Sequence, residues 1–386
     1  MNDFKLKNVR CLGVNMPNEQ NKKIYYNRWI VIVFALICSL TTLSIIAFAE
    51  NQTKDTAPSG STTWKVMVGG QAAIEPQEYG PTGAWQFMRF YPDNITINVG
   101  DKIEWILNSA EPHTVTFLGP GKKMPDLIVP ENNSSARMMF NPLVILAQGG
   151  QTYNGTMLTG SGQMDVPPQF PKEYNLTFTK PGDFEYLCAF HNMMKGKVIV
   201  QAAGTAYPKT QEQINAEAAK LLAEDMELAL KAGQKAKNAV ALTGSNGTTR
   251  YEVKMGYGDG NIALMRFIPT NLTIHAGDVV EWTRGDVETP HTITFLSGGK
   301  EPELVLVEPQ QRGPPKFVLN PKVLTPAGGK VYSGKGYYNS GFIWGTMVPL
   351  PGPQGYNLTF DTPGTYDYIC VLHDYMGMKG QIKVLP

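Results

Sequence analysis

The sequence predicts an all-β body of two tandem β-sandwiches, joined by an α-helical connector and preceded by an N-terminal transmembrane or signal helix. The body repeats itself: residues 88–105 are matched 177 residues later by residues 265–282, and both stretches contain Met-Arg-Phe-x-Pro and Gly-Asp-x-x-Glu-Trp. Within each copy, apolar residues alternate in short runs between Gly-Asp and Pro-Gly turns. This pattern is typical of antiparallel strands with one buried face.

Length and composition agree with two or three globular domains and argue against one class of partner. The chain has 386 residues, of which 42% are hydrophobic and 17% charged, enough for two or three separate cores. Its net charge of +1 gives no basic surface for nucleic acid. We expect a cytoplasmic segment at 1–28, an anchor or signal peptide at 29–49, a tether at 50–61, a first domain at 62–202, a helical connector at 203–247 and a second domain at 248–386.

The apolar stretch at 29–49 is an uncharged run preceded by Lys22, Lys23 and Arg28. Its length suits a membrane span with the positive charges on the inner side. It also ends in Ala-Phe-Ala at 47–49, which a signal peptidase could cut. Anchor and cleaved signal both remain open. Either one predicts an extracytoplasmic body, periplasmic or at the cell surface, that is membrane-anchored or secreted.

The connector has the composition of a helix. Residues 209–237 are dominated by Ala, Glu, Leu and Lys, and Thr210 is the expected N-cap. Ile214, Leu221 and Leu228 lie seven residues apart. We expect this apolar stripe to dock on one or both sandwiches.

The two cysteines of the body point to a metal rather than to a disulfide. Cys188 lies in the first copy and Cys370 in the second, so there is one per repeat. Each is followed three residues later by a histidine, His191 or His373, and then by methionine within the same short loop.

A second imidazole is available in each copy. His113 and His291 both occur in the sequence Pro-His-Thr, well before the cysteine loop. A thiolate and two imidazoles with a weak axial thioether form the ligand set that suits copper cycling between its two oxidation states. The sequence therefore predicts two mononuclear copper sites.

These residues carry a resemblance to a known family. Gly100-Asp-x-x-x-Trp105, Pro112-His113 and the Tyr186-x-Cys188-x-x-His191 loop, together with their counterparts in the second copy, resemble the cupredoxin or blue (type 1) copper proteins. The resemblance covers most of residues 62–386 except the connector and two insertions, at 120–170 and 298–352. It implies tandem plastocyanin- and amicyanin-like Greek-key sandwiches, with the early histidine at a strand end and the other ligands in the loop before the last strand.

The resemblance also implies the ligands and the route of electrons. The implied ligand sets are His113, Cys188, His191 and Met194 in the first copy and His291, Cys370, His373 and Met378 in the second. Met376 is the competing axial ligand, but Met378 keeps the Met-x-Gly step into the last strand in register. In this family the later histidine is usually exposed, and electrons enter and leave through it.

The function implied is single-electron transfer between redox protein partners outside the cytoplasm, with no enzymatic activity. Copper nitrite reductases and multicopper oxidases use similar domains but need further histidines. Of the five histidines in this chain, only His275 is not already assigned as a ligand, and it lies on a predicted strand. The alternative is a structural or copper-delivery subunit of a membrane-bound complex. Both insertions are expected to be structured, as a cover near the copper or as a docking surface.

Overall fold

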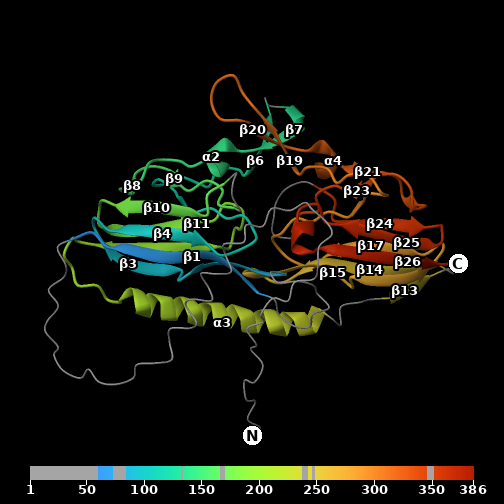
Figure 1. The fold of residues 1–386 in the computed structure, drawn as a ribbon, viewed down its shortest axis with the longest axis horizontal. Helices are drawn as coiled ribbons and strands as arrows, with labels where there is room; N and C mark the ends of the chain where they lie inside the picture. The colour runs from blue at the N-terminus through green and yellow to red at the C-terminus, as the bar shows by residue number, and fades with distance from the viewer. Residues whose placement is uncertain are drawn as a thin grey trace, which may run out of the picture. The chain divides into compact units, whose positions relative to one another are not determined.

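The computed structural model describes residues 60–72, 84–131, 134–165, 170–236, 242–245, 248–345 and 352–386. All residues before 60, including the predicted anchor or signal peptide at 29–49, lie outside these described residues. Within the described residues, no helix is long and apolar enough to cross a membrane. The described chain is mostly β, with few helices (Figure 1).

The first sandwich has two layers that enclose one core. One layer has the order β2 (Trp85–Tyr91), β1 (Thr63–Ala72), β4 (Lys102–Leu107), β10 (Glu173–Phe178) and β8 (Thr152–Tyr153). The other has the order β3 (Asn94–Asn98), β12 (Lys195–Gln201), β11 (Gly182–Leu187), β5 (Thr116–Phe117) and β9 (Thr159–Gly160). Trp105 lies fully buried between the layers, with its ring against those of Phe117 and Tyr186.

The second sandwich repeats this strand order. One layer runs β15 (Ile262–Ile268), β14 (Thr248–Tyr257), β17 (Val279–Arg284), β24 (Gly355–Phe360) and β22 (Val331–Tyr332), with β13 (Leu242–Ser245) also paired to β14. The other runs β16 (Asn271–His275), β26 (Lys379–Leu385), β25 (Gly364–Ile369), β18 (Thr294–Phe295), β23 (Tyr338–Ser340) and β21 (Pro326–Ala327); the 3-10 turn η2 (Asp374–Met376) precedes β26. Trp282 takes the place of Trp105. The predicted duplication is confirmed by the matching strand order.

The two sandwiches share a continuous sheet, which sequence periodicity alone does not predict. Strand β2 pairs with β15 in antiparallel fashion, with Gln86 opposite Ala263. Both faces of β2 are buried: Met88 and Phe90 face the first core, whereas Trp85 and Phe87 belong to a separate cluster that includes residues of a helix. A strand that is covered on both sides carries apolar residues on both faces instead of on one alternating face.

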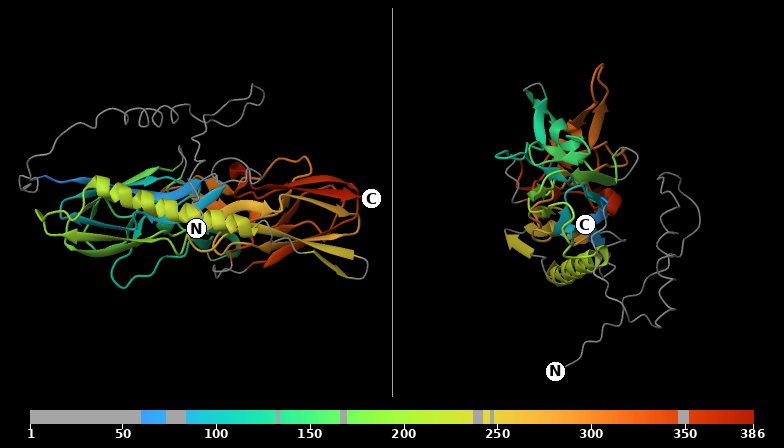
Figure 2. Two further views of the ribbon diagram at one scale, coloured as in Figure 1. Left: turned by 90° about the horizontal axis from the view of Figure 1, so that it is seen from below. Right: turned by 90° about the vertical axis from the view of Figure 1, so that its left-hand side faces the viewer.

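That helix is α3 (Gln211–Ala236), which packs against strands of both domains where they join. Figure 2 shows it crossing beneath both halves of the shared sheet. The hydroxyl of Thr210 accepts a hydrogen bond from the Gln213 backbone at 3.3 Å, and the Gln213 side chain accepts one from the Thr210 backbone at 2.9 Å. This reciprocal pair is a capping box, and it begins the helix at the predicted N-cap.

The buried face of α3 differs from the predicted stripe of residues seven apart. Leu228 is 50% exposed, whereas Asp225 and Ala229 are buried. A straight helix has 3.6 residues per turn, so positions seven apart drift around its axis and leave the contact face. The face that is buried consists of Ile214, Ala218, Asp225, Ala229, Gly233 and Ala236.

Asp225 is a charged residue in the middle of this face and is 1% exposed. The hydroxyl of Tyr91 donates a hydrogen bond to Oδ2 of Asp225 at 2.6 Å, and the Arg89 guanidinium lies 3.1 Å from Oδ1. Burial and, next, the hydrogen bond to Asp225 raise the pKa of Tyr91. Because a buried carboxylate needs both its counter-charge and its hydrogen bonds, this cluster fixes α3 on β2.

Replacing Asp225 by alanine is expected to destabilise the folded chain by about 3 kcal/mol, since Arg89 and Tyr91 would both lose their buried partner. Tyr91→Phe, which removes only one hydrogen bond, should cost about 1 kcal/mol. Denaturant unfolding followed by circular dichroism measures both changes. Equal midpoints for the parent and Asp225→Ala would show that this cluster does not hold the helix.

The two insertions pair with each other and form a second connection between the domains. The first contributes β6 (Ile128–Glu131) and β7 (Ser134–Phe140), and the second contributes β19 (Val305–Glu308) and β20 (Lys316–Leu319), in the order β19-β20-β7-β6. Val318 of β20 lies opposite Met139 of β7, and the Lys316 ammonium lies 2.7 Å from the Glu131 carboxylate. Figure 1 shows this small sheet above the junction of the sandwiches.

An Asn-Pro pair begins a short helix in each insertion. Helices α2 (Pro142–Ile145) and α4 (Pro321–Leu324) have proline at the first helical position. The side chain of Asn141 accepts a hydrogen bond from the Leu143 backbone at 3.0 Å. Asn320 does the same for Lys322 at 3.1 Å. Asparagine as cap and proline at the next position satisfy or remove the free N–H groups of a first helical turn.

Candidate metal centres

Three side chains of the first domain converge on one buried point. The Sγ of Cys188 lies 3.7 Å from Nδ1 of His113 and 3.6 Å from Nδ1 of His191. The two Nδ1 atoms are 3.1 Å apart, and all three residues are buried. Two nitrogens and one sulfur can therefore reach a single metal ion.

The backbone around the cysteine explains how these side chains are held. The loop at 188–194 joins adjacent strands β11 and β12, and it is closed by a hydrogen bond from the Cys188 N–H to the Met194 carbonyl at 3.0 Å. The Thr114 N–H donates to the Cys188 sulfur at 3.4 Å, while the Thr114 hydroxyl accepts from the Ala189 N–H at 2.8 Å. The thiol is thereby fixed to the segment just before β5, which carries the earlier histidine.

The second domain repeats the arrangement. The Sγ of Cys370 lies 3.8 Å from Nδ1 of His291 and 3.4 Å from Nδ1 of His373, and the two nitrogens are 3.2 Å apart. The Thr292 N–H donates to the Cys370 sulfur at 3.4 Å. Six of the eight candidate ligands are thus brought together in two groups of three.

Met376 and Met378, the two candidate axial ligands of the second loop, lie in different cores. Met194 packs in the same core cluster as Cys188, and Met378 packs in the same cluster as Cys370. Met376 is also buried, but its side chain belongs to the core cluster of the first domain. The Cys370 N–H donates to the Met378 carbonyl at 3.0 Å, as Cys188 does to Met194. Met378 is therefore the structural counterpart of Met194.

Comparison with known proteins gives the family. A family model described as copper binding proteins of the plastocyanin/azurin family matches residues 81–201 and 344–385. A plastocyanin from Scenedesmus fuscus is 31% identical over 132 residues, which are 34% of this chain and 96% of the relative. The chain belongs to the plastocyanin/azurin family of copper binding proteins. Amicyanin-alpha from Methylorubrum extorquens is 30% identical over 133 residues, which are 34% of this chain and 76% of that protein. The solved structure of oxidised plastocyanin from Dryopteris crassirhizoma is 22% identical, with a TM-score of 0.20, covering 35% of this chain and 99% of that one.

Copper is the cofactor that this family binds, and both groups of side chains fit it. Imidazole nitrogen with thiolate sulfur is a donor set that copper prefers. Burial lowers the pKa of His191 to about 3, and burial raises the pKa of the Cys188 thiol to about 11. The imidazole is therefore neutral and ready to coordinate, whereas copper binding requires the thiol to release its proton.

The two sites differ in what their early histidines contact on the side away from the metal position. Nε2 of His291 lies 2.8 Å from Oδ2 of Asp286, and both residues are buried. Burial opposes protonation of His291, but the Asp286 carboxylate outweighs it and raises the pKa of His291 to about 10. In the first domain, Nε2 of His113 is buried and has no hydrogen-bond partner among the described residues.

A glycine with positive φ makes room for each of these histidine rings. Gly69 has a φ of 69°, and a Cβ added there would lie 2.5 Å from Nε2 of His113. Gly256 has a φ of 66°, and its Cβ would lie 2.6 Å from Nε2 of His291. Both glycines interrupt the strand register as β-bulges in β1 and β14. The bulges thus allow the backbone to approach the imidazoles closely.

We expect Asp286→Asn to weaken copper binding at the second site roughly ten- to a hundredfold, which is typical when the partner of a ligating histidine is lost. Its reduction potential should rise, because a less basic imidazole stabilises the oxidised ion less. Potentiometric titration of the two-copper protein measures the potentials of both sites in one sample, with the first site as internal reference. An unchanged second potential would contradict the role assigned to Asp286.

The later histidines are not exposed, contrary to the expectation from the family resemblance. His191 is 4% exposed and His373 is 3% exposed. The physical reason is that each ligand loop is covered by the other domain. Met193 and Tyr375, each two residues after the histidine, remain 43% and 56% exposed at the edges of these loops.

The contacts that cover the loops are hydrogen bonds across the domain boundary. The N–H of Met193 donates to Oε1 of Glu288 at 2.9 Å. The hydroxyl of Tyr375 donates to the Ala110 carbonyl at 2.9 Å. Ala110 and Glu288 each lie three residues before the early histidine of their own domain. In both cases, the residue two after the later histidine of one domain contacts the residue three before the early histidine of the other domain.

Three acidic residues at the sites were missed by the sequence analysis. Asp286 and Glu288 lie five and three residues before His291, and Glu111 lies two residues before His113. Their closeness in sequence to a predicted ligand was the available signal. The sequence did not show which site each acid faces, because Glu111 and Glu288 contact the opposite domain.

Proposed function

We propose that the chain is an extracytoplasmic blue copper protein that transfers single electrons between redox protein partners through two type 1 copper sites. The observation that carries the proposal is the convergence, in each domain, of two Nδ1 atoms and one Sγ at a buried point. Copper supplies a one-electron couple when it is bound there. The predicted apolar segment at 29–49 supports export, and it would attach the protein to a membrane if it is retained.

The proposed ligands follow the geometry of the two groups and the position of the methionines. They are His113, Cys188, His191 and Met194 in the first site and His291, Cys370, His373 and Met378 in the second. Met378 is preferred to Met376 as axial ligand because it shares a core cluster with Cys370. Its backbone bond to Cys370 also matches that of Met194 to Cys188.

The surroundings of the ligands favour a carrier over copper delivery. A protein that hands copper on needs accessible ligands that exchange the metal. Here both cysteines and all four histidines of the sites are buried, and backbone hydrogen bonds restrain the cysteine loops. Such a site excludes water and holds its ligands in one arrangement, which limits the rearrangement needed when the charge of the metal changes.

The parent chain is expected to bind two copper ions and to have an intense visible thiolate-to-copper absorption. Cys188→Ala and Cys370→Ala should each bind one ion and lose roughly half of this absorption, since each thiolate serves one site. A copper assay with visible spectroscopy on the three proteins measures this. Loss of the absorption in only one variant would contradict the presence of two type 1 sites.

The axial ligand can be identified by a pair of matched methionine variants. Met378→Leu is expected to raise the potential of the second site by on the order of 60 mV, the equivalent of a tenfold change in relative affinity for the two copper states. Met376→Leu has the same change in side-chain volume and should leave that potential close to the parent value. Redox titration in the Cys188→Ala background isolates the second site. The reverse pattern would assign Met376 as the ligand.

A further inference from the structure

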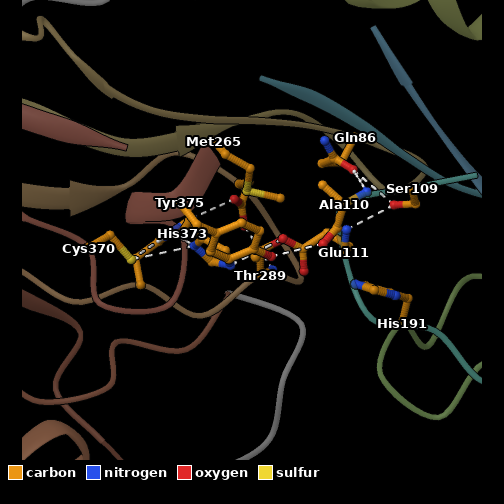
Figure 3. Close-up of polar contacts among 12 residues, drawn as sticks. Gln86, Ser109, Ala110, Glu111, His191, Met265, Thr289, Cys370, His373 and Tyr375 are labelled. Atoms are coloured by element: carbon orange, nitrogen blue, oxygen red, sulfur yellow. Dashed lines mark hydrogen bonds and ion pairs between the residues drawn. The ribbon is translucent and has the colours of Figure 1, made fainter. Parts of the chain in front are cut away.

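We propose that Glu111, a residue of the first domain, is a positioning residue for the copper ligand His373 of the second domain. This inference rests on the proposed function, because it takes His373 to be a ligand. Oε1 of Glu111 lies 3.3 Å from Nε2 of His373, and both side chains are nearly fully buried. Figure 3 shows the Glu111 carboxylate pointing toward His373.

The direction of the His373 ring explains why an acceptor is needed there. Its Nδ1 faces Cys370 and His291, so its Nε2 points away from the metal position. A neutral imidazole that coordinates through Nδ1 carries its hydrogen on Nε2. Oε1 of Glu111 is buried and makes no hydrogen bond to any other described residue, so it is free to accept from His373. A histidine ligand normally donates its second N–H to such an oxygen, which fixes the ring and makes it a stronger donor to the metal.

Glu111 is itself held in place by the strand at which the two domains join. The Glu111 N–H donates to the Ser109 hydroxyl at 3.0 Å, and that hydroxyl donates to the Gln86 side chain at 2.9 Å. The Ala110 N–H also donates to Gln86, at 3.0 Å. Gln86 lies on β2 opposite Ala263 of β15. The carboxylate is thus positioned by the sheet that crosses from one domain to the other.

The interface by itself does not require an acid at this position. Glu111 lies two residues before His113, and the residue two before His291 is Thr289. A buried carboxylate is costly unless it is paired or hydrogen-bonded. The imidazole of His373 is the nearby group that can pair with the Glu111 carboxylate. The acid at this position therefore serves the second site and not domain contact in general.

The test compares variants of Glu111 in the full chain carrying Cys188→Ala, so that only the second site is observed. Glu111→Leu removes the acceptor, Glu111→Asp withdraws it by one methylene, and Glu111→Gln keeps an oxygen of similar reach. Glu131→Leu is the matched control, because Glu131 is also buried and pairs across the domains with Lys316, in the sheet formed by the insertions. Copper affinity by chelator competition, the copper EPR spectrum and the reduction potential are measured for each.

We expect Glu111→Leu and Glu111→Asp to weaken Cu(II) binding at the second site roughly ten- to a hundredfold and to change its EPR spectrum, with Glu111→Gln close to the parent. Each tenfold loss that is specific to Cu(II) raises the potential by about 59 mV. In the Cys370→Ala background, which isolates the first site, the same substitutions should have no effect. Glu131→Leu should leave both sites unchanged.

Two results would overturn the inference. One is parent-like affinity and spectrum in both Glu111→Leu and Glu111→Asp. The other is an equal change at both sites, or the same change in Glu131→Leu, which would indicate a general loosening of the domains. If Glu111→Leu does not fold by circular dichroism, the comparison of Glu111→Asp with Glu111→Gln decides. A parent chain that binds no copper at the second site would instead refute the proposed function.

Discussion

The structure depends on the burial of the two ligand loops against each other's domains. His191 and His373 are shielded by residues of the opposite copy, so each metal position is closed off from water only when the domains are held together. Three connections serve this purpose: the pairing of β2 with β15, the helix α3 beneath that junction, and the sheet formed by the two insertions.

The two sites have the same kinds of ligand but differ in their electrostatic surroundings. In the second site, buried acidic side chains lie next to both histidines, Asp286 at His291 and Glu111 at His373. In the first site, Nε2 of His113 has no hydrogen-bond partner among the described residues, and Glu288 contacts the loop backbone instead. The negative charge of Asp286 beside His291 favours the more highly charged metal ion. The second site is therefore expected to hold its electron less tightly than the first.

The sequence predicted the features that lie within a single copy and recur in the other. The paired strands, the spacing of Cys188 and His191, and the early His113 depend on local pattern and recur 177 to 182 residues later. Features that arise between the copies were not predictable, because their residues have no fixed separation. Strand β2 was the one local signal of a second covered face, because it has aromatic residues on both faces although Gln86 and Arg89 interrupt them. The prediction that α3 buries residues seven apart was wrong at Leu228, because the contact face follows 3.6 residues per turn.

The joining of two copies in one chain also removes a symmetry requirement. A dimer of identical subunits must present the same residue on both sides of its two-fold axis. Here Ala110 and Glu288 occupy equivalent positions but differ chemically, and so do Glu111 and Thr289. Each half of the interface can therefore mutate without a matching change in the other half. After the duplication, a single substitution can change the surroundings of one copper site and leave the other unchanged, which is impossible in a homodimer.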